Sequence, residues 1–107
     1  PDATPRARVL PFPELESRYY LRIMVKDQPG VIGQLSQILG SHGISISAIR
    51  QRETDDEQFV PIVITTHRAV EGSMQDALKQ INALPTTAER AVCIRIVDQP
   101  KEFAEGL

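Results

Sequence analysis

The stretch YYLRIMVKDQPGVIGQLSQIL (residues 19–39) decides the fold, because the spacing of its apolar residues changes at a turn in its middle. Before the turn, apolar residues alternate with others, which is typical of a strand with one buried face. After the turn they recur at the spacing of a helix, and Gly43 is well placed to end that helix. We therefore expect a strand from Tyr19, a tight turn over residues 27–30 and a helix over about residues 31–42.

The rest of the chain predicts three more strands and one more helix. Residues 44–52 alternate apolar residues with serines and predict a strand that changes face along its length. Residues 59–66 predict a strand, in which Pro61 should lie near the start or opposite a gap in pairing. The pattern Val92–Ile96 predicts the final strand. Between these last two strands, an apolar stripe predicts a helix that ends at Leu84-Pro85, and its members are Val70, Met74, Ala77, Leu78 and Ile81.

The predicted order is βαββαβ, which indicates an α+β, ferredoxin-like domain with a four-stranded antiparallel sheet and two helices on one face. This domain should span residues 19–98. Residues 1–18 contain four of the eight prolines and predict a linker or arm, and residues 99–107 predict a polar tail. The other face of the sheet carries an apolar mixture that something should cover, formed by Tyr20, Arg22, Met24 and Val63.

Composition excludes several classes of function. The 107 residues include 12 basic and 14 acidic ones, without a basic cluster that would bind nucleic acid or an anionic membrane. We expect no membrane insertion or export, and the cytoplasm is the expected location. The single cysteine, Cys93, is expected to be a packed thiol. His42 and His67 lack the spacing of metal ligands, so neither a metal site nor a catalytic residue is predicted.

The turn over residues 27–30 has the chemistry to bind an α-amino acid. Pro29 and Gly30 allow a sharp turn, and the amides of Val31 and Ile32 at the start of the helix have no acceptor within it. These amides could receive a carboxylate, and Asp27 could attract an ammonium group. The alternative is structural: Asp27 caps the helix and Gly30 only turns the chain.

The stretches YLRIMVKDQPGVI (residues 20–32) and HGISI (residues 42–46) resemble an ACT domain, and the similarity covers about residues 19–97. More narrowly, the chain resembles the C-terminal regulatory domain of bacterial homoserine dehydrogenases. The segments that carry this narrower resemblance are LPFPELES (residues 10–17), YYLR (residues 19–22), VPIVITTH (residues 60–67) and ALP (residues 83–85).

This resemblance implies domains that pair side by side into a homodimer or larger assembly and bind amino-acid effectors at the interface. Carried over by position, one subunit would contribute Asp27, Gln28, Pro29, Gly30, Val31 and Ile32, and its partner Ser45, Ile46 and Ser47. Relatives that bind serine or threonine often carry Asn where Ser45 stands, and some carry a polar residue where Val25 stands. The identity of the effector therefore stays open.

The resemblance further implies a parent enzyme that reduces aspartate semialdehyde to homoserine with NAD(P). That cofactor would belong to a missing catalytic part, because this chain lacks the G-x-G-x-x-G motif of a dinucleotide fold. The expected role is feedback control by threonine, exerted on the chain's own catalytic domain. The alternatives are a constitutive dimerisation module without an effector, a small phosphatase, for which the turn offers an anion where an Arg is needed, and an RNA-binding sheet.

Overall fold

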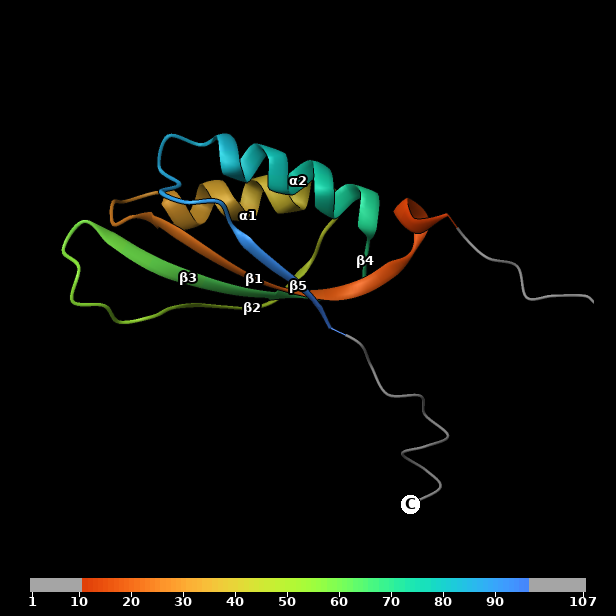
Figure 1. Ribbon diagram of the computed structural model, residues 1–107, viewed down its shortest axis with the longest axis horizontal. Coiled ribbons are helices and arrows are strands. Elements are labelled where there is room, and N and C mark those ends of the chain that lie inside the picture. The colour runs from red at the N-terminus through yellow and green to blue at the C-terminus, as the bar shows by residue number, and fades with distance from the viewer. Residues whose placement is uncertain (1–10, 97–107) are drawn as a thin grey trace, which may run out of the picture.

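An antiparallel sheet lies under two helices in the computed structural model, which describes residues 11–96 (Figure 1). The sheet contains four main strands, β1 (Glu16–Lys26), β2 (Ile46–Gln51), β3 (Phe59–Thr66) and β5 (Val92–Ile96). The helices are α1 (Val31–Ser41) and α2 (Glu71–Ala83), and two short elements complete the fold, the 3-10 turn η1 (Phe12–Glu14) and β4 (Ala69–Val70). The predicted α+β class and βαββαβ order are confirmed.

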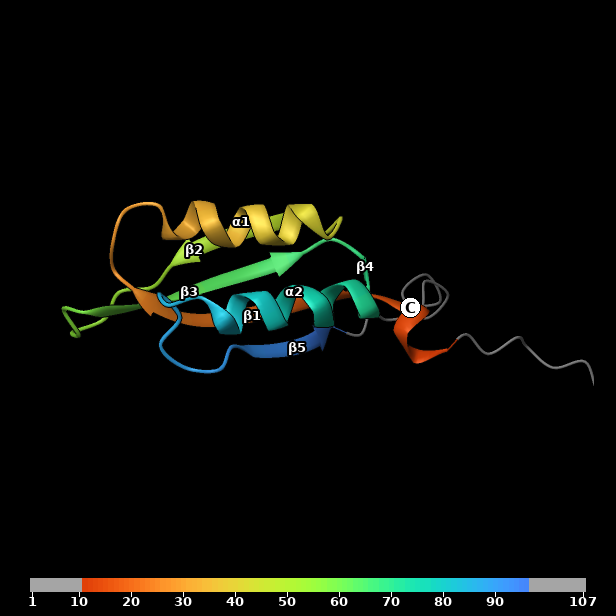
Figure 2. The ribbon, with the colours of Figure 1, turned by 90° about the horizontal axis from the view of Figure 1, so that it is seen from above.

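Strand β1 is the centre of the sheet, because it pairs antiparallel with β3 on one edge and with β5 on the other. Strand β2 pairs with β3, so the order is β2-β3-β1-β5. Seen from above, α1 lies along β2 and β3, and α2 lies along β1 and β5 (Figure 2). Strand β2 therefore forms one edge of the sheet, with no strand beyond it in the described part of the chain.

The core lies between the sheet and the helices. Alternate residues of β1 and β3 point toward the helices and are almost completely buried. Full burial of one large aliphatic side chain contributes roughly 1.5 to 3 kcal/mol, so this shared face is the main source of stability. The largest core members are Tyr19, Leu21, Ile23, Leu35, Leu39, Ile62, Ile64, Met74 and Ile81.

Two expectations need correction at the ends of elements. Strand β1 begins at Glu16 and not at Tyr19, because Glu16 and Ser17 pair with the unpredicted strand β4. Val70 belongs to that strand and is 38% exposed, so it is not part of the apolar stripe of α2. Its pairing with Glu16 holds it in an extended conformation, and the helix starts one residue later.

The irregular positions of β2 and β3 agree with the sequence. The register between these strands shifts between Ile46 and Ala48, which produces the predicted change of face in β2. Pro61 lies near the start of β3, opposite the position just beyond the last paired residue of β2. Its carbonyl accepts a hydrogen bond from the Arg52 amide at 3.0 Å, and its missing N–H falls where the ladder has ended.

Gly43 ends α1 in the left-handed region, with φ of +74°, and alanine there should destabilise the domain by about 1 kcal/mol. Gly40, three positions earlier within α1, is the matched control. A Cβ at either position meets nothing within 4 Å, so the two variants differ in backbone conformation alone. Gly40→Ala should stabilise by roughly 0.5 to 1 kcal/mol. Urea unfolding measures both, and equal effects would contradict this explanation of the helix end.

Candidate functional site

The turn between β1 and α1 is shaped by the backbone and not by the Asp27 side chain. Gly30 has φ of +87° and occupies the N-cap of α1, where no side chain makes a capping hydrogen bond. The Asp27 amide donates to the carbonyl of Gln58 at 2.9 Å, and the Gln28 amide donates to the carbonyl of Lys26 at 3.0 Å. The structural alternative, in which Asp27 caps the helix, is therefore not observed.

The first amides of α1 are available to a ligand. Val31 and Ile32 donate no backbone hydrogen bond to a described residue, whereas the Gln34 amide already donates to the carbonyl of Gly30. Such free donors, together with the positive end of the helix dipole, favour an anion by roughly 0.3 to 1 kcal/mol. Within residues 11–96 the exposed Asp27 carboxylate likewise accepts no hydrogen bond and forms no ion pair.

A hollow of about 210 Å³ brings all the predicted turn residues, Asp27 through Ile32, to one place. Its other walls include Gln51 from β2 and the strand residues Val60 and Ile62. The hollow is smaller than the roughly 300 to 1,000 Å³ of pockets that bury drug-sized ligands, so it suits only a small molecule. A neighbouring hollow of about 520 Å³ shares Asp27, Gln51 and Val60 with it, and continues along the polar hairpin between β2 and β3.

Gln51 was missed by the sequence analysis. It pairs with Ile62, whose side chain is buried under the helices, so Gln51 points to the helix side of the sheet. The predicted change of face in β2 is the signal that could have identified it, because this change decides which side of β2 meets the turn.

The residues expected from a partner subunit lie elsewhere in the same chain. Strand β2 begins with Ile46 and Ser47, directly after Ser45, whereas Gln51 and the hollow are at its end. The Ser45 carbonyl accepts a hydrogen bond from the His67 amide at 2.9 Å, and the Ser47 hydroxyl lies 3.1 Å from that of Thr65. One chain therefore does not bring the two predicted groups of residues together.

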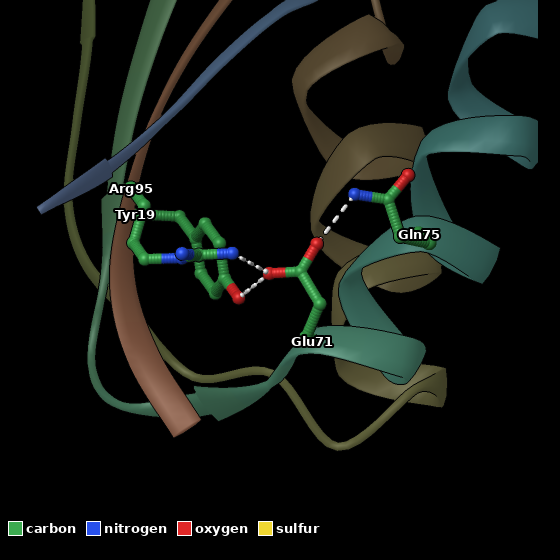
Figure 3. A network of polar contacts seen from close by, with 4 residues as sticks. All are labelled: Tyr19, Glu71, Gln75 and Arg95. Atoms are coloured by element: carbon green, nitrogen blue, oxygen red, sulfur yellow. Dashed lines mark hydrogen bonds and ion pairs between the residues drawn. The ribbon is translucent and has the colours of Figure 1, made fainter. Parts of the chain in front are cut away.

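A second polar cluster surrounds Glu71, at the start of α2 (Figure 3). This carboxylate is 4% exposed and accepts hydrogen bonds from the Tyr19 hydroxyl, from Arg95 at 3.2 Å and from Gln75 at 2.6 Å. Burial alone would raise the pKa of the Glu71 carboxyl, but these three donors outweigh it and lower that pKa. Burial, followed by the bond to Glu71, raises the pKa of Tyr19 to about 12.

The Glu71 cluster joins four elements and lines none of the hollows described above. It links α2 to β1 through Tyr19 and to β5 through Arg95, whose guanidinium lies 4.6 Å from the centre of the Phe12 ring in η1. The Glu71 amide also donates to the carbonyl of Leu15 at 2.8 Å. The cluster is therefore structural, and it attaches part of the predicted arm to the domain.

Other candidate groups offer no reactive site. Cys93 is half-buried against the core, and burial raises the pKa of its thiol to about 11, so it stays protonated at neutral pH. Within residues 11–96, no three His, Cys, Asp or Glu side chains gather to hold a metal ion. Neither helix in this range is long and apolar enough to cross a membrane. The predicted tail, residues 99–107, lies outside the described residues.

Comparison with known proteins places this geometry in a family. Residues 19–86 match the ACT domain. The chain belongs to the ACT domain family. The predicted resemblance is thereby confirmed. The turn over residues 27–30 leads into the first helix of an ACT fold. The ACT domain from the GTP pyrophosphokinase of Chlorobium tepidum shares the fold alone, with a TM-score of 0.57 and 11% identity over 77% of this chain and 100% of that one.

This chain is similar to the C-terminal region of bacterial homoserine dehydrogenases. It is 40% identical to the homoserine dehydrogenase of Pseudomonas aeruginosa, over 90% of this chain and 22% of that protein. The structure of a homoserine dehydrogenase from Thiobacillus denitrificans matches 91% of this chain and 21% of that one, with a TM-score of 0.78 and 32% identity. The chain thus spans about a fifth of the length of these relatives.

Replacing Glu71 with Gln should lower the free energy of unfolding by roughly 1.5 to 3 kcal/mol at neutral pH, because charge-assisted hydrogen bonds are lost in a buried place. The folded-state pKa of Glu71 is lowered, so its contribution is present above the unfolded pKa and disappears as pH falls through the folded one. The difference between the native chain and Glu71→Gln should therefore shrink in acid.

Urea unfolding from neutral to acid pH measures this difference, with Glu89→Gln as the control because Glu89 is exposed. The control should change stability by less than about 0.5 kcal/mol. A Glu71→Gln effect that stays constant with pH would contradict the role of the charge.

Proposed function

We propose that this ACT domain is the regulatory part of a homoserine dehydrogenase and binds an amino acid, with threonine as the first candidate. The similarity to homoserine dehydrogenases over 90% of the chain supports this assignment. The reduction of aspartate semialdehyde and the NAD(P) site would belong to the remaining four-fifths of the enzyme, in the cytoplasm. The domain itself would contribute recognition and regulation.

The observation that carries the proposal is that free backbone amides and a free carboxylate lie at the same hollow. The amides of Val31 and Ile32 offer donors to an α-carboxylate, and Asp27 offers an acceptor to an α-ammonium group. Both groups are needed for a free amino acid, because each of its charges must be matched when it leaves water. Gln51 would supply a neutral polar contact to a side-chain hydroxyl, as threonine has.

A second copy would complete the site through the free edge of β2. Two copies of β2 related by a two-fold axis pair antiparallel, so the beginning of one strand lies beside the end of the other. Ser45, Ile46 and Ser47 of one copy would then approach Gln51 and the hollow of its partner. This arrangement would add polar groups of the partner to the walls of the hollow, and it would satisfy backbone groups that an edge strand leaves unpaired.

Regulation would follow from a difference in threonine affinity between a more active and a less active state of the enzyme. Threonine is the expected effector because it is the end product of the pathway that homoserine enters. A coupling free energy of about 1 to 3 kcal/mol, typical of allosteric sites, corresponds to a change of roughly 5- to 150-fold in a binding affinity that is coupled to threonine, such as that for the substrate.

Replacing Asp27 with Asn should weaken threonine binding by about tenfold, because the ammonium group loses its charged partner while the shape of the turn is kept. Asp76→Asn on α2 is the matched control, since this exposed aspartate lies away from the hollow. Titration calorimetry of threonine into the chain and both variants measures the affinities, and the control should bind like the native chain.

An unchanged affinity in Asp27→Asn would refute the assigned site. A chain that releases no heat with threonine or any other amino acid, yet still forms dimers in analytical ultracentrifugation, would instead favour a constitutive dimerisation module. The β2 edge would then be the functional feature, and the turn only a helix start.

A further inference from the structure

The sheet face opposite the helices, here called the open face, is an apolar floor crossed by arginines. Pairing across the strands places its residues in three rows. Val92 and Ile94, at the β5 side, are 45% and 54% exposed, the latter more than any other large apolar side chain of the described chain. The rows are Ala48, Thr65, Tyr20 and Ile94; then Arg50, Val63, Arg22 and Val92; then Arg52, Pro61 and Met24.

Three arginines give the open face its positive charge. Arg22, Arg50 and Arg52 are exposed and form no ion pair with another described residue. The acidic side chains at their border lie on the side of Arg52, where Glu53, Asp55 and Asp56 line the same hollow of about 520 Å³. Two hollows of about 230 and 260 Å³ lie between the arginines, and both are lined by Tyr20, Val63 and Arg52. Guanidinium groups around an apolar floor are complementary to a surface that presents carboxylates around apolar side chains.

We propose that the open face docks an acidic surface on the part of the enzyme that precedes this domain in the same polypeptide. This inference rests on the proposed function. A parent of the size of the Pseudomonas aeruginosa relative has nearly four-fifths of its length outside this domain. A tethered partner is present at high effective concentration, so a modest, largely polar interface is enough to hold it.

Charge and composition select this occupant over two others. A second copy laid face to face would bring Arg22, Arg50 and Arg52 against their own counterparts, and like charges across an interface cost free energy. Single-stranded nucleic acid needs aromatic platforms for its bases, whereas Tyr20 is the one aromatic residue in the three rows and the rest of the floor is aliphatic. An acidic protein surface suits both the charge and the floor.

Strand β2 connects this docking surface to the proposed effector site. Successive residues of a strand point to opposite faces, so Gln51 lines the hollow beside the turn while Arg50 and Arg52 point to the open face. A ligand held between two β2 strands would therefore act on the strand that presents Arg50 and leads directly into Arg52. This gives the effector a direct route to the docked catalytic part, without a change in the core.

The test is a charge reversal in the full-length enzyme, Arg22→Glu with Arg50→Glu, which avoids the residues that line the effector hollow. A control reverses two exposed charges elsewhere, Lys79→Glu with Arg90→Glu. Three quantities are measured: threonine affinity by calorimetry, inhibition of the activity by threonine, and the radius of gyration by small-angle scattering. We expect threonine still to bind, with inhibition reduced at least tenfold and a larger radius of gyration, in the open-face variant alone.

Inhibition and radius that match those of the native enzyme would overturn the docking proposal. Binding of single-stranded RNA by the wild type through these arginines would also overturn it. So would a charge-reversed variant that loses self-association while its inhibition by threonine is unchanged. If native enzyme bound no threonine, the proposed function would fail instead, and the radius of gyration would still decide whether the open face docks the catalytic part.

Discussion

The whole structure depends on the alternation of side chains along β1, a central strand that pairs with β3 on one edge and with β5 on the other. Its odd-numbered residues from Tyr19 to Val25 are buried under the helices, and its even-numbered ones form the opposite face of the sheet. A shift of one residue in its register would expose the core and bury Arg22, at a cost of many kcal/mol. Because β1 is so firmly placed, the turn that follows it has a defined position relative to β3.

The candidate site inherits its geometry from this constraint. Two hydrogen bonds fix the chain where it leaves β1. The Lys26 amide donates to the carbonyl of Thr86 at 2.8 Å, and the Asp27 amide donates to the carbonyl of Gln58 at 2.9 Å. Gly30 then turns the chain so that α1 begins with free amides on residues that line the hollow. A ligand would therefore meet donors that the fold has already ordered, which reduces the entropy lost on binding. Strand β2 supplies the remaining wall and the edge through which a second copy can approach.

The sequence predicted the features that depend on local pattern. Alternation and helical spacing gave the four strands, both helices and the turn, because each is encoded within its own residues. Features made by distant residues were not predicted: β4 exists because Val70 meets Glu16, and Glu71 is buried because Tyr19 and Arg95 provide donors for it. A glutamate in the first turn of a helix is ordinary, so its sequence context gives no sign of burial. Gln51 was missed for a similar reason, since its face depends on the bulge in β2.

The central claim is that the start of α1 and the beginning of a partner's β2 together bind an amino acid. The most direct test is the change in backbone amide chemical shifts when threonine is added to the isotope-labelled chain. The claim predicts saturable shifts at Val31 and Ile32, and at Ser45 to Ser47, with one common affinity. Shifts confined to other regions, or none at all in a properly folded dimer, would contradict it.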